Sequence, residues 1–227
     1  MRKFVYSLSL LLMALFFVVS TASANENVEE ESDTLIVSDV FVKFVNEAYK
    51  EGNTIEVIDS EGNDISNQFV EDTYNLFLEG DYVSIYNLIN DQDLSFAYEE
   101  EKIVENEGVS TFATTKTMAT NKSFYKVAKS QHGISKDWSA TIRSSMTYQV
   151  LPKKVVSLGK TTVSFDTTFG TLFSPYQSGV STSGKNNGSS ATFSASYTMK
   201  ATQELAKGVP WRDHNFGSHS HSFTKAP

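Results

Sequence analysis

The histidines are the residues of this sequence best suited to chemistry, because imidazole can act as a base or bind a metal ion. Three of them lie near the C-terminus, at His214, His219 and His221. On a β-strand, residues two apart share a face, so His219 and His221 would point the same way. That spacing can chelate zinc or copper, with His214 or Asp213 as third ligand. The alternative is an exposed polar strand face, which the lack of a paired cysteine favours.

Two short patterns resemble known sites, but each lacks a required residue. Residues 59–64 resemble the start of a calcium loop, yet Asp64 stands where glycine is needed and Val70 where the bidentate glutamate belongs. A hairpin turn is the better interpretation. Gly159-Lys160-Thr161 resembles the end of a phosphate-binding loop, but Lys154 replaces its opening glycine. The sequence also has no Gly-x-Ser-x-Gly and no His-Glu-x-x-His. It therefore favours a protein that is not an enzyme, and it predicts no cofactor.

Two aromatic residues are candidates for contact with a ligand. Tyr176 and Trp211 follow Pro175 and Pro210, so we expect both to lie in loops with exposed rings. Trp211 is followed by Arg212, and both residue types are enriched where binding energy concentrates. Tyr176, Trp211 and Arg212 are the predicted binding residues.

The first 24 residues have the pattern of a cleavable signal peptide. Arg2 and Lys3 precede an uncharged, apolar stretch, which ends in the small-residue motif Ala22-Ser23-Ala24. The alternative is an uncleaved membrane anchor. We predict cleavage after Ala24 and a secreted, extracellular protein. The sequence has no cysteine, which excludes a disulfide framework and thiol chemistry and suits a Gram-positive exporter.

Charge divides the remaining chain into two parts. Residues 25–108 hold 23 acidic and three basic residues, whereas residues 109–227 hold four acidic and 14 basic residues. Serine, threonine and proline concentrate in the second part. Such an asymmetry predicts two modules of different character.

The acidic part has the periodicity of helices. Apolar residues from Val37 to Ala48 recur at steps of three and four, and similar patterns cover Ser66–Glu79 and the residues after Asp81. A short strand is expected over Thr54–Asp59.

The cationic part has the alternation of half-buried strands. From Trp138 to Val150, apolar residues occupy nearly every second position, and the pattern returns at 163–173 and 191–201. Shorter strands are expected at Phe124–Ala128 and Phe216–Phe223. These patterns predict an antiparallel sandwich or small barrel.

The predicted fold class is therefore α+β. A signal peptide (1–24) precedes a small, mainly helical acidic module (25–108), which could be a pro-segment. A linker (109–121) then leads to a cationic all-β domain (122–227).

Three functions remain open from the sequence. The first is a secreted, non-enzymatic binding module at an anionic surface, meaning a cell-wall polymer, a polysaccharide or a membrane, and not nucleic acid. Its acidic part would mask the cationic part or dock on it by charge pairing. The second is a membrane-active toxin or antimicrobial protein, in which Thr161–Phe173 and Ser190–Thr202 form an inserting hairpin. The third is a metal-dependent extracellular enzyme.

Overall fold

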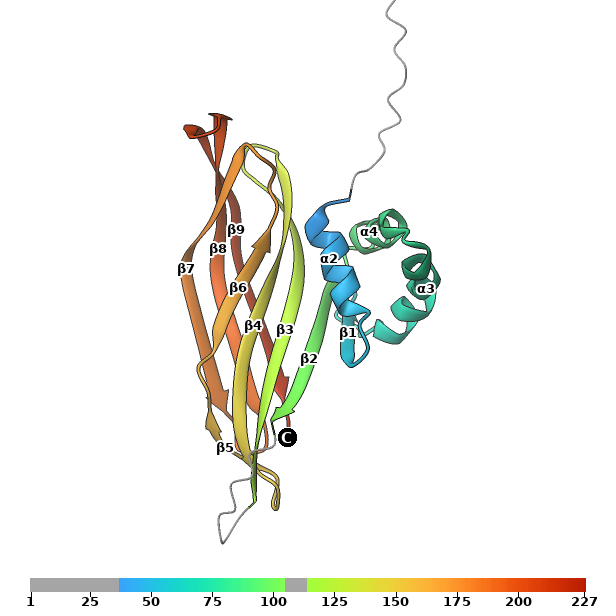
Figure 1. The fold of residues 1–227 in the computed structure, drawn as a ribbon, viewed down its shortest axis with the longest axis vertical. Helices are drawn as coiled ribbons and strands as arrows, with labels where there is room; N and C mark the ends of the chain where they lie inside the picture. The colour runs from blue at the N-terminus through green and yellow to red at the C-terminus, as the bar shows by residue number, and fades with distance from the viewer. Residues whose placement is uncertain (1–36, 105–113) are drawn as a thin grey trace, which may run out of the picture. The chain divides into compact units, whose positions relative to one another are not determined.

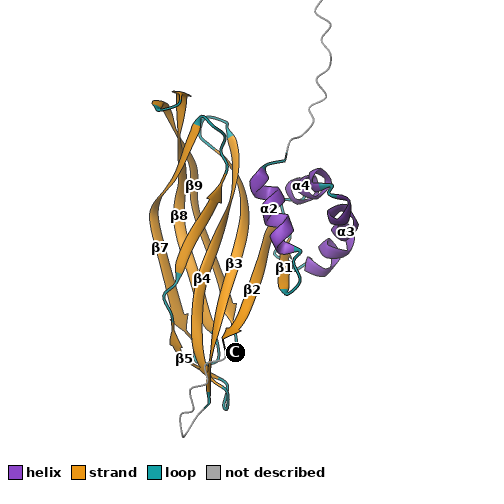
Figure 2. Cartoon of the chain, viewed as in Figure 1, coloured by secondary structure: helices purple, strands orange, loops and turns teal. Residues whose placement is uncertain are grey.

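Two antiparallel sheets make up most of the fold (Figures 1 and 2). The computed structural model describes residues 37–104 and 114–227. The first sheet has the order β1-β2-β3-β4-β5, and β6 pairs with β4 beside β5. Its strands are β1 (Asn53–Ile58), β2 (Ser95–Val104), β3 (Thr115–Lys129), β4 (Ser135–Gln149), β5 (Lys154–Leu158) and β6 (Thr162–Thr167). The second sheet consists of β7 (Phe173–Asn186), β8 (Ala191–Ala206) and β9 (Val209–Lys225).

The strand alternation seen in the sequence builds the core between the sheets. Every second residue of β4 and β8 is buried, including Trp138, Ile142 and Met146 on β4 and Phe193 and Tyr197 on β8. These side chains interdigitate because successive strand residues point to opposite faces of a sheet. The predicted antiparallel sandwich is confirmed.

Three helices pack beside β1 and β2 (Figure 2). They are α2 (Asp39–Ala48), α3 (Ser66–Glu79) and α4 (Tyr82–Asp91). The Ser38 side chain caps α2 by accepting the Phe41 N–H at 3.1 Å, and Asp81 caps α4 in the same way. Gly80 ends α3 in the left-handed conformation, with φ of 74°. These helices follow the predicted periodicity.

A second core joins the helices to the outer face of the first sheet. Phe41 and Phe44 of α2 contact Tyr125 of β3 with ring centroids 4.9 and 5.6 Å apart. Val57 of β1 and Phe96 of β2 are buried in the same cluster. The inner face of the first sheet is therefore apolar, and its outer face is apolar only where the helices cover it.

The boundary between acidic and cationic parts runs through the first sheet. Glu99–Val104 of β2 pair with Thr117–Lys122 of β3, and the described residues form one compact unit. Residues 115–121, predicted to be linker, belong to β3. Their alternation was hidden because Thr120, a polar residue, occupies a fully buried position. The predicted signal peptide, with Ala22 and Ala24, and residues 105–113 lie outside the described residues.

The hairpin predicted for a membrane-active protein is wrong in its pairing. β6 pairs with β4, whereas β8 pairs with β7 and β9. Residues 187–190 join β7 to β8, and β7 was missed because it is rich in serine and glycine rather than in apolar residues.

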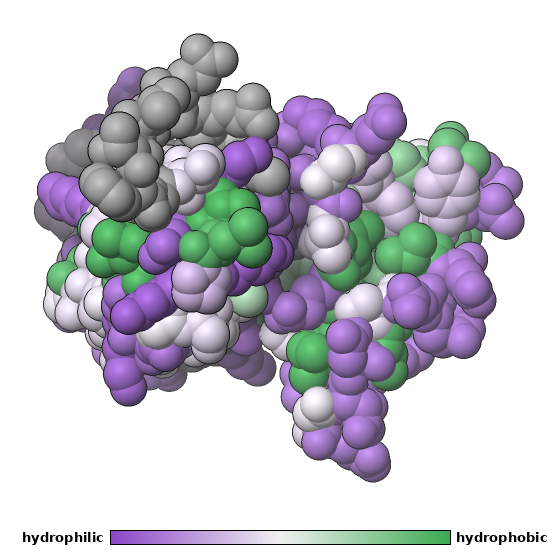
Figure 3. Space-filling model, turned by 90° about the horizontal axis from the view of Figure 1, so that it is seen from below, coloured by the Kyte–Doolittle hydropathy of each residue, from purple (hydrophilic) through white to green (hydrophobic). Residues whose placement is uncertain are grey.

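The surface seen from below is mostly hydrophilic, with hydrophobic residues in separate patches (Figure 3). Scattered apolar residues of this kind are normal on soluble folds. Among the described residues, no helix has the length and apolar character needed to cross a membrane.

Candidate binding groove

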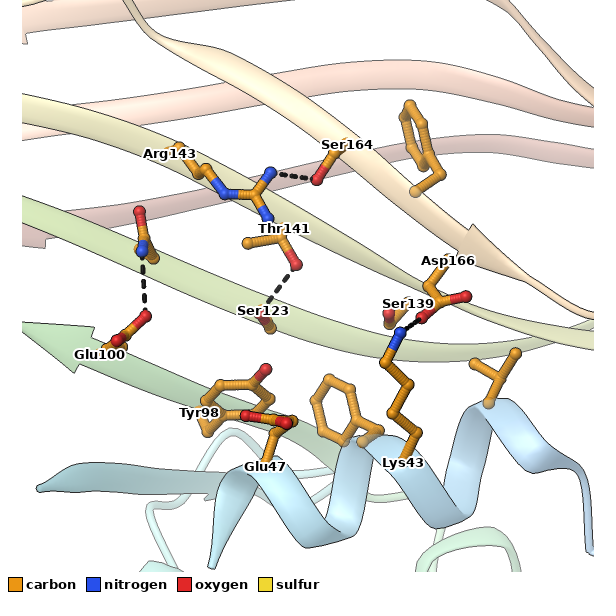
Figure 4. Close-up of a pocket in the computed structure, with 14 residues that line it drawn as sticks. Lys43, Glu47, Tyr98, Glu100, Ser123, Ser139, Thr141, Arg143, Ser164 and Asp166 are labelled. Atoms are coloured by element: carbon orange, nitrogen blue, oxygen red, sulfur yellow. Dashed lines mark hydrogen bonds and ion pairs between the residues drawn. The ribbon is translucent and has the colours of Figure 1, made fainter. Parts of the chain in front are cut away.

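A groove of about 490 Å³ opens where α2 lies against the outer face of the first sheet (Figure 4). Residues of α2, β2, β3, β4 and β6 line it. We call it the α2 groove. The face that forms its floor is the polar side of the same strands whose apolar side fills the sandwich core, because side chains alternate along each strand.

A row of hydroxyl groups crosses the floor from strand to strand. In register, Tyr98 of β2 stands opposite Ser123 of β3, Ser123 opposite Thr141 of β4, and Thr141 opposite Ser164 of β6. The Ser123 and Thr141 hydroxyl oxygens are 2.8 Å apart. Neighbouring strands are about 4.8 Å apart, so the row offers evenly spaced donors and acceptors.

Charged and amide side chains flank this hydroxyl row. A second register row lies two positions further along the strands. It consists of Glu100, Asn121 and Arg143. The Asn121 amide donates to Glu100 at 3.1 Å. On the other side of the row, Ser139 of β4 stands opposite Asp166 of β6.

Helix α2 forms the wall of the groove because one of its faces packs in the core and the other faces the groove. Its buried face holds Phe41 and Val45 in the core, and Ser38 donates to the buried Asp137 carboxylate of β4. Lys43 and Glu47, one helical turn apart, then lie along the groove.

Each carboxylate in the groove is paired with a lysine. Lys43 pairs with Asp166, and this hydrogen-bonded contact raises the lysine pKa. The Lys50 Nζ is 2.7 Å from Glu47, and the Lys102 Nζ is 2.7 Å from Glu100. The hydrogen bond from Lys102 is the main cause that lowers the pKa of Glu100.

Arg143 differs from the other charged residues of the groove. Its guanidinium donates to the Ser164 hydroxyl, as Figure 4 shows, and it forms no ion pair with any residue the structure describes. Arg143 is exposed. Because the three acidic side chains have lysine partners, Arg143 is the charge best placed to attract a ligand.

The three histidines predicted to bind metal are engaged separately. His214 is buried, with Nδ1 3.0 Å from the Ser130 hydroxyl and Nε2 2.9 Å from Gln203. His219 bonds the Phe216 carbonyl at 3.1 Å. Within residues 37–104 and 114–227, no three His, Cys, Asp or Glu side chains gather as a metal site.

His221 lies in the sandwich core rather than on an exposed face. Its ring stacks on Phe124 with centroids 4.4 Å apart, and its Nε2 is 3.2 Å from the Tyr197 hydroxyl. The Trp138 indole donates to the same hydroxyl at 2.9 Å. Burial lowers the pKa of His221 to about 4, so the imidazole is neutral at pH 7 and completes a buried network.

The predicted binding residues lie away from the α2 groove, on the second sheet. Tyr176 is on β7 with 39% of its surface exposed, and Trp211 is on β9 with 51% exposed. The Arg212 guanidinium stacks on the Trp211 ring at 4.6 Å. The exposed rings were foreseen, but both belong to strands instead of loops.

The sequence offered no direct signal for the α2 groove. Its residues come from five elements between Val40 and Asp166, and most are ordinary polar residues on the solvent side of their strand or helix. Only strand register brings Tyr98, Ser123, Thr141 and Ser164 into one row, and register cannot be read from alternation alone.

Comparison with known proteins gives no assignment. No protein-family model matches the chain, and neither the curated proteins nor the solved structures contain a match. The function is therefore argued from the geometry of the site.

Proposed function

We propose that this protein is a secreted, non-enzymatic binding module that holds an acidic polysaccharide of the cell envelope in the α2 groove. The observation that carries the proposal is the hydroxyl row that crosses the floor, with the guanidinium of Arg143 beside it, which forms no ion pair with any described residue. The N-terminal pattern that ends at Ala24 supports export.

The floor suits a sugar because both sides of the contact are rich in hydroxyl groups. A hydroxyl can donate one hydrogen bond and accept two, so Ser123, Thr141 and Ser164 can adapt to several orientations of a sugar ring. Tyr98 adds apolar ring surface to the lining. A long groove with repeated contacts is a common way for a module to hold a polymer.

Arg143 supplies the preference for an acidic polymer. A guanidinium presents a planar fork of donors that matches a carboxylate or a phosphate with two parallel hydrogen bonds. On binding, Arg143 would exchange its contact with Ser164 for the stronger charge-assisted pair. The groove would therefore select uronic acid or phosphate groups over neutral sugars.

The carboxylates of the groove support a binding role more than hydrolysis. Glycoside hydrolysis needs a carboxyl group with a raised pKa to protonate the leaving oxygen. Lys102 shifts the pKa of Glu100 in the opposite direction, and Asp166 and Glu47 are held by Lys43 and Lys50.

The acidic part fits the proposal as a docked component instead of a removable mask. The Lys225 ammonium lies 2.6 Å from Glu99 and 2.7 Å from Glu101, and the buried Lys122 ammonium lies 2.5 Å from Glu56. These contacts join strands on either side of the charge boundary. Removal of residues 25–108 would also remove α2, the wall of the groove.

The test is sedimentation of the mature chain with insoluble cell walls that either keep or have lost their anionic polymer. We expect binding to intact walls, and at least tenfold weaker binding by Arg143→Ala. The matched control is Lys154→Ala, which removes an exposed positive charge from β5, outside the groove. This control variant should bind like the wild type.

Equal losses of wall binding in Arg143→Ala and Lys154→Ala would refute binding in the α2 groove. General attraction between cations and an anionic wall would then explain the binding. No binding to either wall preparation would refute the polysaccharide ligand. Release of reducing sugar ends during incubation would show that the protein is an enzyme.

A further inference from the structure

The hairpin between β8 and β9 ends in an exposed apolar tip. The strands join through Lys207 and Gly208, and Gly208 adopts a φ of 83° that the tight turn requires. In this tip, the exposed fractions are 64% for Leu205, 49% for Val209 and 51% for Trp211. We call residues 205–212 the β8–β9 tip.

A neighbouring loop adds to this apolar surface. The Leu172 carbonyl accepts the Glu204 N–H at 2.8 Å, which holds the loop before β7 against the hairpin. The Leu172 side chain is 42% exposed. The tip therefore presents several large apolar side chains on a fixed backbone, where a water-soluble loop would carry polar residues.

Among the described residues, neither Lys207 nor Arg212 of the β8–β9 tip forms an ion pair, whereas the nearby carboxylates accept hydrogen bonds. Glu204 accepts hydrogen bonds from the Gly208 N–H at 2.6 Å and the Ser174 hydroxyl at 2.9 Å. Asp213 accepts the Thr202 hydroxyl at 2.8 Å. Lys207 is exposed, and the exposed Arg212 stacks on Trp211.

We propose that the β8–β9 tip docks into an anionic lipid surface. Trp is favoured at the boundary between lipid headgroups and acyl chains, and Leu and Val are favoured below it. Lys207 and Arg212 can extend toward the headgroups while their stems cover apolar surface. Anionic lipid then complements the two cations of residues 205–212.

The size of the tip favours lipid over a protein partner. A stable protein interface buries about 800 Å² on each side. A turn of two residues with a few exposed side chains is too small and too convex for that, whereas insertion into lipid needs only a shallow apolar projection.

The net charge of −8 does not oppose this docking. Most acidic residues precede Gly108, and the tip follows Glu204. At physiological ionic strength the screening length is about 8 Å, so the membrane responds to the charges nearest to it.

The two tryptophans of the chain allow a direct test with the full mature protein. Trp138 is fully buried and Trp211 is half exposed, so only Trp211 should respond to lipid. On addition of vesicles of equal phosphatidylcholine and phosphatidylglycerol, we expect emission to shift to shorter wavelength. In Trp211→Phe the shift should vanish.

A matched pair of variants distinguishes docking through the tip from nonspecific hydrophobic adsorption to the vesicles. Leu205 and Leu151 are exposed leucines at different turns, with exposed fractions of 64% and 82%. We expect Leu205→Asp to lower the partition coefficient at least tenfold, and Leu151→Asp to change it less than twofold. Arg143→Ala, which tests the α2 groove, should bind vesicles like the wild type.

Several results would overturn the proposal. Equal effects of Leu205→Asp and Leu151→Asp would do so, as would binding without a shift in Trp211 emission. Self-association in the absence of vesicles that Leu205→Asp abolishes would assign the tip to a second copy of the chain. Circular dichroism of each variant is the control for an intact fold.

Discussion

Protonation of the buried His221 should couple the stability of the protein to pH. In the folded protein, this imidazole lies between Phe124 and Tyr197, and burial followed by repulsion from Lys126 lowers its pKa to about 4. The ordinary histidine pKa is 6.5. The difference is about 2.5 units, and each unit corresponds to about 1.4 kcal/mol.

The sign follows from the direction of this shift. Between pH 6.5 and 4 the unfolded chain binds a proton at His221 that the folded protein does not bind, so the free energy of unfolding falls as pH falls. The contribution is fully present above pH 6.5. By pH 4 about 3 kcal/mol should be lost. Burial also lowers the pKa of His219, which adds a loss of the same sign.

The assay is urea unfolding from pH 7.5 to 4, followed by the fluorescence of the buried Trp138. His221→Gln removes the titration but keeps an acceptor for the Tyr197 hydroxyl, so its stability should depend less on pH than that of the wild type. His132→Gln, at an exposed position, is the control. If wild type and His221→Gln lose the same free energy between pH 7.5 and 4, the assigned burial of the imidazole is wrong.

Three further stability changes follow from the contacts, each measured by urea unfolding. Trp138→Phe loses the hydrogen bond to Tyr197 and core volume, so it should cost about 3 kcal/mol. Glu56→Gln leaves the buried Lys122 without its anion and should cost about 2 kcal/mol, less than for a fully buried pair because Glu56 is partly exposed. Lys225→Ala should cost at most about 1 kcal/mol, and the cost should shrink in 1 M salt.

The elements of this fold were largely predictable because each has a local signal. The stripe from Val37 to Ala48 gave α2, and strict alternation gave β4 and β8. β7 and the first half of β3 were missed since serine, threonine and glycine there carry no apolar period, although Thr120 is fully buried. Local patterns report burial only when the buried residue is apolar.

The candidate sites were harder to predict than the strands that carry them. The spacing of His214, His219 and His221 suggested a metal site, but contacts with Ser130, the Phe216 carbonyl and Tyr197 set the environment of each ring. The α2 groove depends on register among four strands and on a helix far away in sequence. Such long-range pairing has no local trace in the residues themselves.

The uneven charge of the chain has a physical explanation in the shared sheet. Strands β2 and β3 pair across the charge boundary, and Lys122 and Lys225 reach glutamates of β1 and β2. If the acidic part were a pro-segment released by cleavage, it would have to dissociate without disrupting a β-sheet. Here removal of the acidic part would expose the edge of β3 and the rings that pack on Tyr125. The contacts therefore favour an acidic part that stays in place and shapes the groove.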